Sequence, residues 1–363
     1  MGVTKLARAH GVHRRPVIHK VDLDGISKVR VNTISKWGPL PGSAATRNET
    51  HPIKYPALHL ENRQIASRHR IRPLCGDYKS DICVYGTGAK APQKPKKVLI
   101  VFAHQSSGSF NAAAKNAAVE VLTAQGCTVE VSELYAMSFK ATATAEDIKG
   151  DVKNAENFCY LEESKLAWEQ GKLSDDITKE QTKLTEADLI IFQFPMYWFS
   201  VPAILKGWID RVLTNGFAFS KEKRYSQGIF KDKKAMLSFT TGSLESMFSP
   251  TGINGDMNVT LWPLQNGILH YCGFQVLAPQ IFWAPSSAAA EDRKSMLDSW
   301  RTRLQGLLEE KPLSFIPLDC FDEKAFQLKP DVHEKHSSQE FGLTVGIHLN
   351  KPLPPHSQMK AGC

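Results

Sequence analysis

The sequence of 363 residues has no apolar run of about 18 residues, the length that a helix needs to cross a membrane. Its beginning lacks the apolar stretch of a secretory signal, and Leu6 stands where a myristoylated chain carries Ser or Thr. Asp22 and Asp24 come too early for a transit peptide, which is poor in acidic residues. We therefore expect a protein of the cytosol without membrane insertion.

Cysteine is scarce and irregularly placed. The chain holds 7 cysteines, an odd number, and no two of them form a CxxC pair. A disulfide framework or a Cys-rich zinc site needs closer and more regular spacing. This pattern favours a reducing compartment, which agrees with the expected cytosolic location.

Acidic residues are few in the first quarter of the chain. Residues 1–97 hold 19 Lys and Arg against 6 Asp and Glu, a net charge of +13, whereas the rest holds 26 against 31, a net charge of −5. A basic arm can bind nucleic acid or an acidic membrane. Here the charges are scattered among Pro and His without a helical stripe, so we expect a solvated extension that binds neither.

Sustained periodicity is also absent from residues 1–94. The segment APQKPKK, residues 91–97, is typical of a linker because it holds three lysines and two prolines. We expect residues 1–95 to be a basic N-terminal extension that is unstructured or a gene-model artefact. Residues 96–312 are then the main domain and residues 313–363 a C-terminal extension.

Strand-like and helix-like segments alternate after residue 97. The expected strands are 98–103, 127–134, 187–194, 233–241 and 274–282, and the expected helices are 111–125, 201–213 and 289–309. Several strands are continuous apolar runs, as in parallel strands whose two faces are covered by helices. The alternation implies right-handed crossovers. We predict an α/β fold, a flavodoxin-like doubly wound parallel sheet of five strands with helices on both faces.

Ligands of such sheets bind outside the carboxyl ends of the strands, where the strand order reverses. Three loops follow expected strands at that edge, namely 104–110, 195–200 and 240–256. The first loop, HQSSGSF, precedes a helix and is rich in small hydroxyl residues, so its N–H groups favour a phosphate. Because the chain has no GxGxxG or Walker A pattern, a plain turn is the simpler interpretation of this loop alone.

The second loop is more specific, because Met196, Tyr197, Trp198 and Phe199 stand in a row just past a buried strand. Large, mostly apolar residues at an exposed strand end need a partner, and a flat aromatic cofactor would be one. The alternative is that they fill a core or a subunit interface. Four consecutive side chains cannot all point one way, so we expect them to be divided between cofactor and interface.

Long peptides of the chain resemble the two-electron NAD(P)H quinone dehydrogenases of the DT-diaphorase type. The likeness runs in order from about residue 96 to 312 and includes KKVLIVFAHQSSGSFN, ADLIIFQFPMYWFSVPAILKGWIDRV, TTGSLESM and NGDMNVTLWPLQNGILHYCGFQVLAPQ. The ending, FGLTVGIHLNKPLPPHSQMKAGC, is similar to the tail of the NAD(P)H-dependent member, which the sister ribosyldihydronicotinamide dehydrogenase lacks. Residues 1–95 resemble nothing in the family.

The resemblance implies a homodimer with FAD bound at each of two sites between the subunits. The implied cofactor-binding residues are His104, Phe110, Asn111, Cys159, Met196, Tyr197, Trp198, Phe199, Thr240, Thr241, Gly242, Ser243, Phe248 and Arg293. Among these, the backbone of residues 240–243 would donate to the isoalloxazine oxygens, and Arg293 would reach the adenine end. Phe219, Lys221 and Tyr271 would border the substrate pocket, partly from the other subunit.

The implied reaction is the two-electron reduction of quinones to hydroquinones by NAD(P)H, with ping-pong hydride transfer through flavin N5. In such an enzyme the cofactor carries the redox chemistry, and the protein supplies stacking, exclusion of water and electrostatics. Reduced flavin gains negative charge near N1 and O2, which fixed donors aimed there stabilise.

The third loop departs from the family at two catalytic relay positions. Phe248 stands where the quinone dehydrogenases have Tyr, and Asn254 stands where they have His. Phe has no hydroxyl group, and Asn can donate a hydrogen bond but cannot titrate. Losing both groups would cost roughly 10²-fold in rate. The sister enzyme also has Asn at the second position, so Asn254 alone does not imply inactivity.

Other positions depart as well. Phe219 and Lys221 replace two tyrosines of the pocket wall, and Cys159 replaces a glutamine that contacts FAD. Ser243 replaces the second glycine of the TTGG signature, which would crowd the flavin edge if the backbone there needs a positive φ.

A metal site is not expected. The sister enzyme holds zinc through two His and one Cys, and the corresponding residues here are Asn266, His270 and Phe315. One ligand does not make a site. Two alternatives to the NAD(P)H enzyme stay open. One is the same fold using a ribosyl dihydronicotinamide as donor, and the other is a flavin-binding protein with weak turnover that acts as a partner-binding module.

Overall fold

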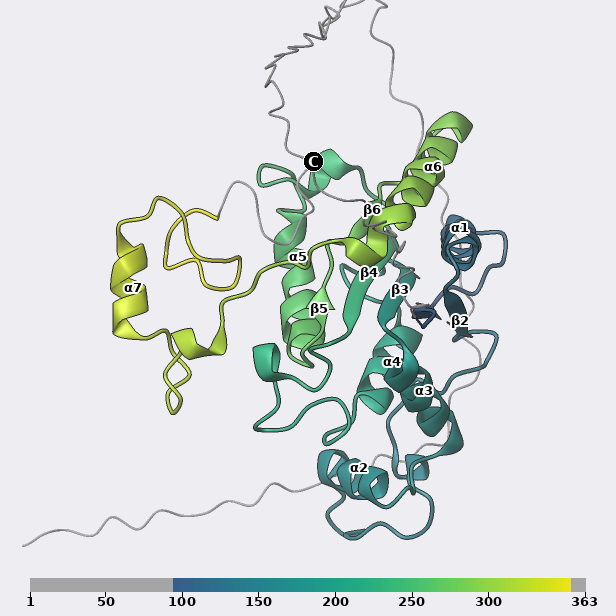
Figure 1. The fold of residues 1–363 in the computed structure, drawn as a ribbon, viewed down its shortest axis with the longest axis vertical. Helices are drawn as coiled ribbons and strands as arrows, with labels where there is room; N and C mark the ends of the chain where they lie inside the picture. The colour runs from purple at the N-terminus through teal and green to yellow at the C-terminus, as the bar shows by residue number, and fades with distance from the viewer. Residues whose placement is uncertain (1–93, 354–363) are drawn as a thin grey trace, which may run out of the picture. The chain divides into compact units, whose positions relative to one another are not determined.

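The computed structural model describes residues 94–353, so the predictions for residues 1–93 and for the end of the chain lie outside the described residues. The strands are β1 (Lys97–Phe102), β2 (Thr128–Glu133), β3 (Leu189–Pro195), β4 (Lys234–Thr240), β5 (Gln275–Val276) and β6 (Gln280–Phe282). The α-helices are α1 (Phe110–Ala124), α2 (Tyr160–Glu169), α3 (Asp175–Glu186), α4 (Ala203–Val212), α5 (Met257–Leu264), α6 (Ala290–Gly306) and α7 (Pro330–Ser337), as drawn in Figure 1.

All strand pairs are parallel, and the strand order is β2-β1-β3-β4-β5, which confirms the predicted doubly wound sheet. The one difference is that the expected last strand, 274–282, is split into β5 and β6, both of which pair with β4. The register shifts by one residue between the two, from Lys234 opposite Gln275 to Ser238 opposite Gln280. Pro279 stands at the break and has no N–H to donate to the ladder.

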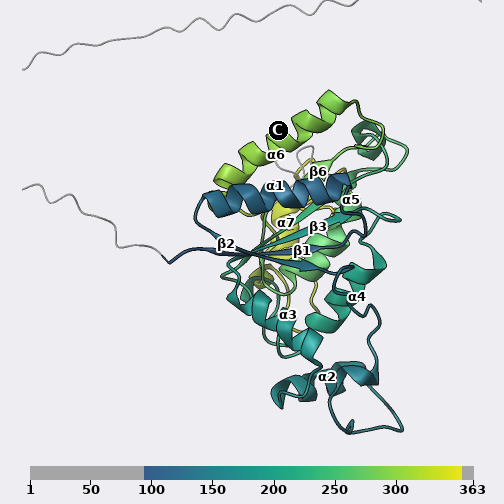
Figure 2. The same ribbon diagram turned by 90° about the vertical axis from the view of Figure 1, so that its right-hand side faces the viewer.

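Side chains of each central strand alternate between two apolar layers. On β1, Val98 and Ile100 pack on the side of α1 and α6, whereas Leu99 and Val101 pack on the side of α3, α4 and α5. Figure 2 shows α1 and α6 on one face of the sheet and α3 and α4 on the other. Because both faces of the central strands are covered, most residues of β1, β3 and β4 are apolar, which explains the continuous runs in the sequence.

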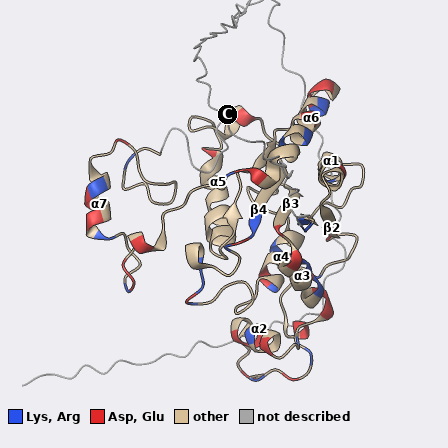
Figure 3. Ribbon diagram, viewed as in Figure 1, with Lys and Arg blue, Asp and Glu red and all other residues tan. Residues whose placement is uncertain are grey.

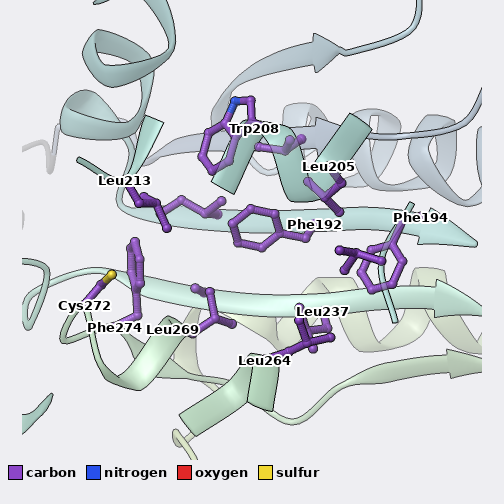
Figure 4. Packing of buried hydrophobic residues seen from close by; sticks show 14 of the residues in the cluster. Phe192, Phe194, Leu205, Trp208, Leu213, Leu237, Leu264, Leu269, Cys272 and Phe274 are labelled. Atoms are coloured by element: carbon purple, nitrogen blue, oxygen red, sulfur yellow. The ribbon is translucent and has the colours of Figure 1, made fainter. Parts of the chain in front are cut away.

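The layer on the side of α3, α4 and α5 holds most of the buried aromatic residues. Figure 4 shows Trp208 of α4 close to Phe192 of β3, and their ring centroids lie 5.7 Å apart at an edge-to-face angle. Phe194 and Phe239, on neighbouring strands, stack at 5.4 Å. Phe194 and Phe239 stand one residue before the carboxyl ends of β3 and β4 and therefore give the loops that follow a rigid base.

The sequence interpretation missed α2, α3, α5 and α7. α5 carries Pro263 and continues without a break into a π-helical turn, η4 (Gln265–His270). A proline removes one backbone donor, and a widened turn is one way to accommodate it. No charged residue occurs on α5 or η4, which Figure 3 shows in tan.

A buried ion pair joins α4 to the segments that precede it. Arg211 of α4 is 1 % exposed and donates to both carboxylate oxygens of Asp147, at 2.8 and 3.0 Å, and to Asp176 of α3 at 2.6 Å. Asp147 also accepts a hydrogen bond from the Tyr160 hydroxyl at 2.8 Å. Cys159 is the N-cap of α2, so this network fixes the place of that predicted cofactor residue.

The described part of the C-terminal extension packs on the domain. Leu313 N donates to Val276 O at 2.7 Å, and Thr344 is buried. Gly346 lies so close to the Trp262 indole that a Cβ there would stand 2.3 Å from it. Of the helices in residues 94–353, none is long and apolar enough to span a membrane.

Candidate flavin pocket

A pocket of about 630 Å³ opens at the carboxyl ends of β1, β3 and β4. Its lining comprises His104, Gly108, Phe110, Asn111, Pro195, Met196, Tyr197, Thr240, Thr241, Gly242, Pro285, Ser286 and Arg293. Nine of the fourteen cofactor-binding residues predicted from the sequence are in this set. The three loops thus meet where the topology predicts, and the loop after β6 adds Pro285 and Ser286, for which the sequence held no signal.

The first loop leads into the N-terminus of α1. Ser109 is the N-cap, and its hydroxyl accepts a hydrogen bond from Ala112 N at 3.1 Å. His104 Nδ1 accepts from Ser106 N at 3.1 Å, which holds the ring over the turn. Phe110 packs edge-to-face on Phe282 of β6 at 5.1 Å. The helix start and its free amides give this end of the pocket a preference for anions.

A chain of buried hydrogen bonds lies beneath the pocket. Ser238 Oγ donates to Gln193 Oε1 at 2.7 Å, and Gln193 Nε2 donates to Asn111 Oδ1 at 2.9 Å. Asn111 Nδ2 then donates to Thr240 Oγ1 at 2.9 Å. The sequence interpretation missed Gln193 and Ser238. The signal available was a polar residue inside two otherwise apolar strands, because a buried polar side chain needs a partner.

The second loop is a tight turn that separates the four consecutive large residues. Tyr197 and Ser200 exchange two backbone hydrogen bonds of 3.0 Å, and both central residues, Trp198 and Phe199, have positive φ of 50° and 61°. This is the signature of a type I′ turn, which usually takes Asn and Gly, so the two positions cost roughly 1–3 kcal/mol each. Trp198 is 98 % exposed. Met196 and Tyr197 line the pocket, whereas Trp198 and Phe199 do not.

The third loop begins with the predicted backbone cradle. The Thr241 amide donates to Phe282 O at 3.0 Å and is therefore already engaged by the strand pair. No hydrogen bond joins the amides of Gly242 and Ser243 to another described residue, so these two amides are the available donors. A Cβ at Gly242 would meet no atom within 4 Å, and Ser243 does not have a positive φ. Serine is thus accommodated without backbone strain.

The two relay positions lie outside the pocket lining. Phe248 is buried and packs between Phe199, at 5.6 Å, and Trp283, at 5.9 Å. Asn254 is half-buried, and its backbone N–H donates to Met247 O at 2.8 Å. Phe248 thus joins the second and third loops, and neither residue carries a group that titrates.

Of the two remaining predicted cofactor residues, one lines the pocket and the other does not. Arg293 lines it from the first turn of α6 and donates to Ala288 O. Cys159 is exposed at the start of α2 and is not part of the lining.

The predicted substrate residues form a separate group. The rings of Phe219 and Tyr271 lie 5.4 Å apart, and Tyr225, which was not predicted, meets Tyr271 edge-to-face at 5.2 Å. Lys221 is exposed on the turn after Phe219. Within the single described chain these residues do not line the flavin pocket.

The three residues at the sister enzyme's zinc positions do lie together. His270 Nδ1 is 3.1 Å from Asn266 Oδ1, and the Phe315 ring stacks on the imidazole at 4.1 Å. Burial lowers the pKa of His270 to about 4. An amide and a phenyl ring leave one imidazole as metal ligand, and residues 94–353 hold no cluster of three His, Cys, Asp or Glu suited to a metal.

Comparisons with known proteins place the chain in a family. The family model described as flavodoxin-like fold matches residues 96–304. The guinea pig (Cavia porcellus) protein named NAD(P)H dehydrogenase (quinone) 1 is 48 % identical over 269 residues, which are 73 % of this chain and 98 % of that protein. The human protein named ribosyldihydronicotinamide dehydrogenase (quinone) is 56 % identical over 218 residues, 60 % of this chain and 94 % of that protein.

A solved structure agrees with the sequence matches. The crystal structure of a protein from Klebsiella pneumoniae described as a putative quinone reductase superposes with a TM-score of 0.62 at 39 % identity. It covers 65 % of this chain and 95 % of the other.

Proposed function

The chain belongs to the flavodoxin-like family of NAD(P)H dehydrogenases (quinone), and on this premise we propose an FAD-dependent enzyme that reduces quinones to hydroquinones with NAD(P)H in a two-electron, ping-pong reaction. The observation that carries the proposal is the pocket of about 630 Å³ at the carboxyl ends of β1, β3 and β4. Nine residues that the resemblance assigns to the cofactor line this one pocket.

The lining fits a flavin. Phe110, Met196 and Tyr197 offer apolar surface to a flat ring, and the amides of Gly242 and Ser243 are available to its oxygens. Gly108 has open space where a Cβ would stand, so a phosphate can approach the backbone before α1. A bound flavin would supply the redox chemistry, accepting two electrons from a nicotinamide and passing them to a quinone.

Arg293 favours FAD over FMN as that flavin. It lies in the first turn of α6, on a different element of the pocket from the α1 N-terminus that suits a phosphate, and its planar guanidinium can stack on an adenine or pair with a diphosphate. FMN has only one phosphate and no adenine. Heat release of the bound cofactor, followed by chromatography and mass spectrometry, distinguishes the two flavins.

The side chains around the third loop are suited to excluding water and carry no group for proton transfer at the two relay positions. Phe199, Phe248 and Trp283 form a continuous apolar wall beside the pocket. Asn254 can hold a substrate oxygen by a hydrogen bond but cannot give up a proton at neutral pH. Hydroquinone formation would then take its proton from solvent, and we expect slower turnover than in relatives with both relay groups.

The enzyme is proposed to be a homodimer that binds its substrate between subunits. Trp198 is 98 % exposed, and Leu244, Ile253 and Val259 are also exposed on the neighbouring loop and on α5. Exposed large apolar side chains on adjacent elements are typical of an interface. Phe219, Lys221 and Tyr271 do not line the flavin pocket of their own chain, which suits a role in the partner's substrate site.

The test is a visible spectrum of the purified chain. We expect flavin absorbance, bleaching within seconds when NADPH is added, and recovery when menadione follows. A colourless protein that gains no flavin absorbance with added FAD would overturn the proposal.

Two second candidates have specific support. The identity of 56 % to the human ribosyldihydronicotinamide dehydrogenase favours a ribosyl-type donor. Measuring the rate of flavin reduction with NADPH and with ribosyl dihydronicotinamide decides between the two donors. Phe248 and Asn254 favour a flavin-binding, partner-binding protein with weak turnover. Flavin that stays oxidised with both NADPH and ribosyl dihydronicotinamide would support the flavin-binding protein with weak turnover.

A further inference from the structure

A second cavity, of about 330 Å³, lies between α5–η4 and the C-terminal extension. Its lining is Arg224, Tyr225, Trp262, Asn266, His270, Ile316, Leu318, Phe321, Phe326, Gly346 and Ile347. None of these residues lines the flavin pocket. Its size is in the range of small-molecule sites, and its walls are mainly aromatic and aliphatic side chains with a few polar groups, which is the usual composition of such sites.

Two aromatic residues that line this cavity have unusual backbone conformations. Tyr225 and Phe326 have φ of +51° and +55°, although bulky side chains rarely adopt this region. Tyr225 is held there because its amide donates to Tyr271 O at 2.9 Å and its carbonyl accepts from Gly228 N at 2.8 Å. The second loop of the flavin pocket also has positive φ angles, at Trp198 and Phe199. Strained positions of this kind cluster where ligands are held.

Arg224 is the one charged residue in the lining. Its guanidinium carbon lies 4.8 Å from the centre of the Phe326 ring, and no carboxylate of residues 94–353 forms an ion pair with it. α5 and η4, which face it across the cavity, carry no charge (Figure 3). A half-buried guanidinium of this kind has unused donors in a fork that matches a carboxylate.

We propose that this cavity binds a planar aromatic carboxylate, with the ring among Tyr225, Trp262 and Phe326 and the carboxylate on the Arg224 guanidinium. The uncharged His270–Asn266 pair leaves that anion without a competing negative group. The site goes beyond the proposed function, because it uses neither the flavin pocket nor its loops.

The test uses the full chain saturated with FAD, so that the flavin pocket is filled, and titrates it calorimetrically with 1-naphthoate and with uncharged 1-naphthamide. We expect naphthoate to bind at least tenfold more tightly than the amide. Arg224→Gln removes the positive charge and keeps a polar side chain. It should lower the affinity for naphthoate by about tenfold or more and leave the affinity for naphthamide unchanged. Arg224→Lys keeps the charge without the guanidinium fork, and its affinity for naphthoate should lie between those of the natural chain and Arg224→Gln.

Lys223→Gln is the matched control, because it removes an exposed charge next to Arg224 in sequence that does not line the cavity. It should bind naphthoate as the natural chain does. Equal affinity for naphthoate in the Arg224→Gln variant, or a loss of affinity in Lys223→Gln instead, would overturn the proposal. Flavin spectra of the variants keep this outcome separate from failure of the proposed enzyme function.

Discussion

Gln193 Nε2 donates to Asn111 Oδ1 across 2.9 Å and thereby ties the middle of the sheet to the flavin pocket. Gln193 is 1 % exposed, and its own carbonyl accepts from Ser238. The pair fixes which end of the Asn111 amide faces Thr240. A residue that touches no ligand thus orients one that lines the pocket.

Gln193→Leu should therefore weaken flavin binding. The substitution leaves Asn111 Oδ1 buried without a donor, which costs roughly 1–3 kcal/mol and frees the amide to rotate. We expect the FAD dissociation constant, measured by quenching of flavin fluorescence, to rise about tenfold.

Gln181→Leu is the control for a purely structural effect. Gln181 is another buried glutamine, which donates to Val212 O at 2.9 Å and Thr214 Oγ1 at 3.0 Å, remote from the pocket. Gln181→Leu should lower the melting temperature by about as much as Gln193→Leu does and leave the FAD affinity unchanged. If both variants lose FAD affinity equally, the hydrogen-bond chain has no particular role in the pocket.

Restoring the relay groups should raise turnover. Phe248→Tyr with Asn254→His returns one hydroxyl and one titratable imidazole to the third loop. A general acid–base contribution at its low end predicts a rise of roughly 10²-fold in kcat for menadione, with flavin content unchanged. Phe248→Leu, which adds no hydroxyl, serves as control. An unchanged kcat in the double variant, with normal flavin spectra, would show that proton transfer does not limit the reaction.

Much of the fold could be predicted because the central strands are buried on both faces. Continuous apolar runs and helix signals located β1, β3, β4, α1 and α4 to within two or three residues. The helix α3 was missed because six of its twelve residues are charged and only two are apolar, and α2 was missed because it is short and four of its ten residues are charged. The split between β5 and β6 depends on a one-residue register shift, which is a tertiary effect.

The candidate site was predictable in its residues but not in its orientations. The resemblance brought nine residues to one pocket, yet the turn that sends Trp198 outward depends on two positive φ angles that Trp and Phe seldom adopt. Gln193 and Ser238 needed the register of β3 against β4 before they could be paired. The second cavity depends on the packing of the C-terminal extension, which has no strong periodicity.

Asp147→Asn should lower stability at neutral pH and flatten its acid dependence. Burial raises the pKa of Asp147, but the hydrogen bonds from Arg211 and Tyr160 and the positive charge of Arg211 outweigh it and hold the pKa below its ordinary value. The carboxylate thus stabilises the fold above its unfolded pKa, and this stabilisation is lost as pH falls through the lower folded value. Urea unfolding at pH 7 should show a loss of about 3 kcal/mol, because the buried Arg211 guanidinium loses one of its two carboxylate partners and keeps Asp176.

The difference between the natural chain and Asp147→Asn should shrink below about pH 4, where this carboxylate begins to take up its proton in the unfolded chain while the folded chain still keeps it ionised. Asp210→Asn is the control, since Asp210 is an exposed partner of Lys206 on α4 and should change stability by less than about 1 kcal/mol. A difference that stays constant from pH 7 to pH 3 would contradict the assignment of the acid dependence to Asp147.

Trp198→Glu should weaken the proposed dimer. The side chain is 98 % exposed in the single chain, so its replacement removes no intrachain packing, whereas a carboxylate buried in an apolar interface is strongly unfavourable. Sedimentation velocity at micromolar concentration should show a dimer for the natural chain and mainly monomer for the variant, with equal unfolding midpoints for the monomers. Trp168→Glu, a change at a partly exposed tryptophan on α2 away from the three loops, should remain dimeric. A Trp198→Glu variant that sediments as the natural dimer would place the interface on another face.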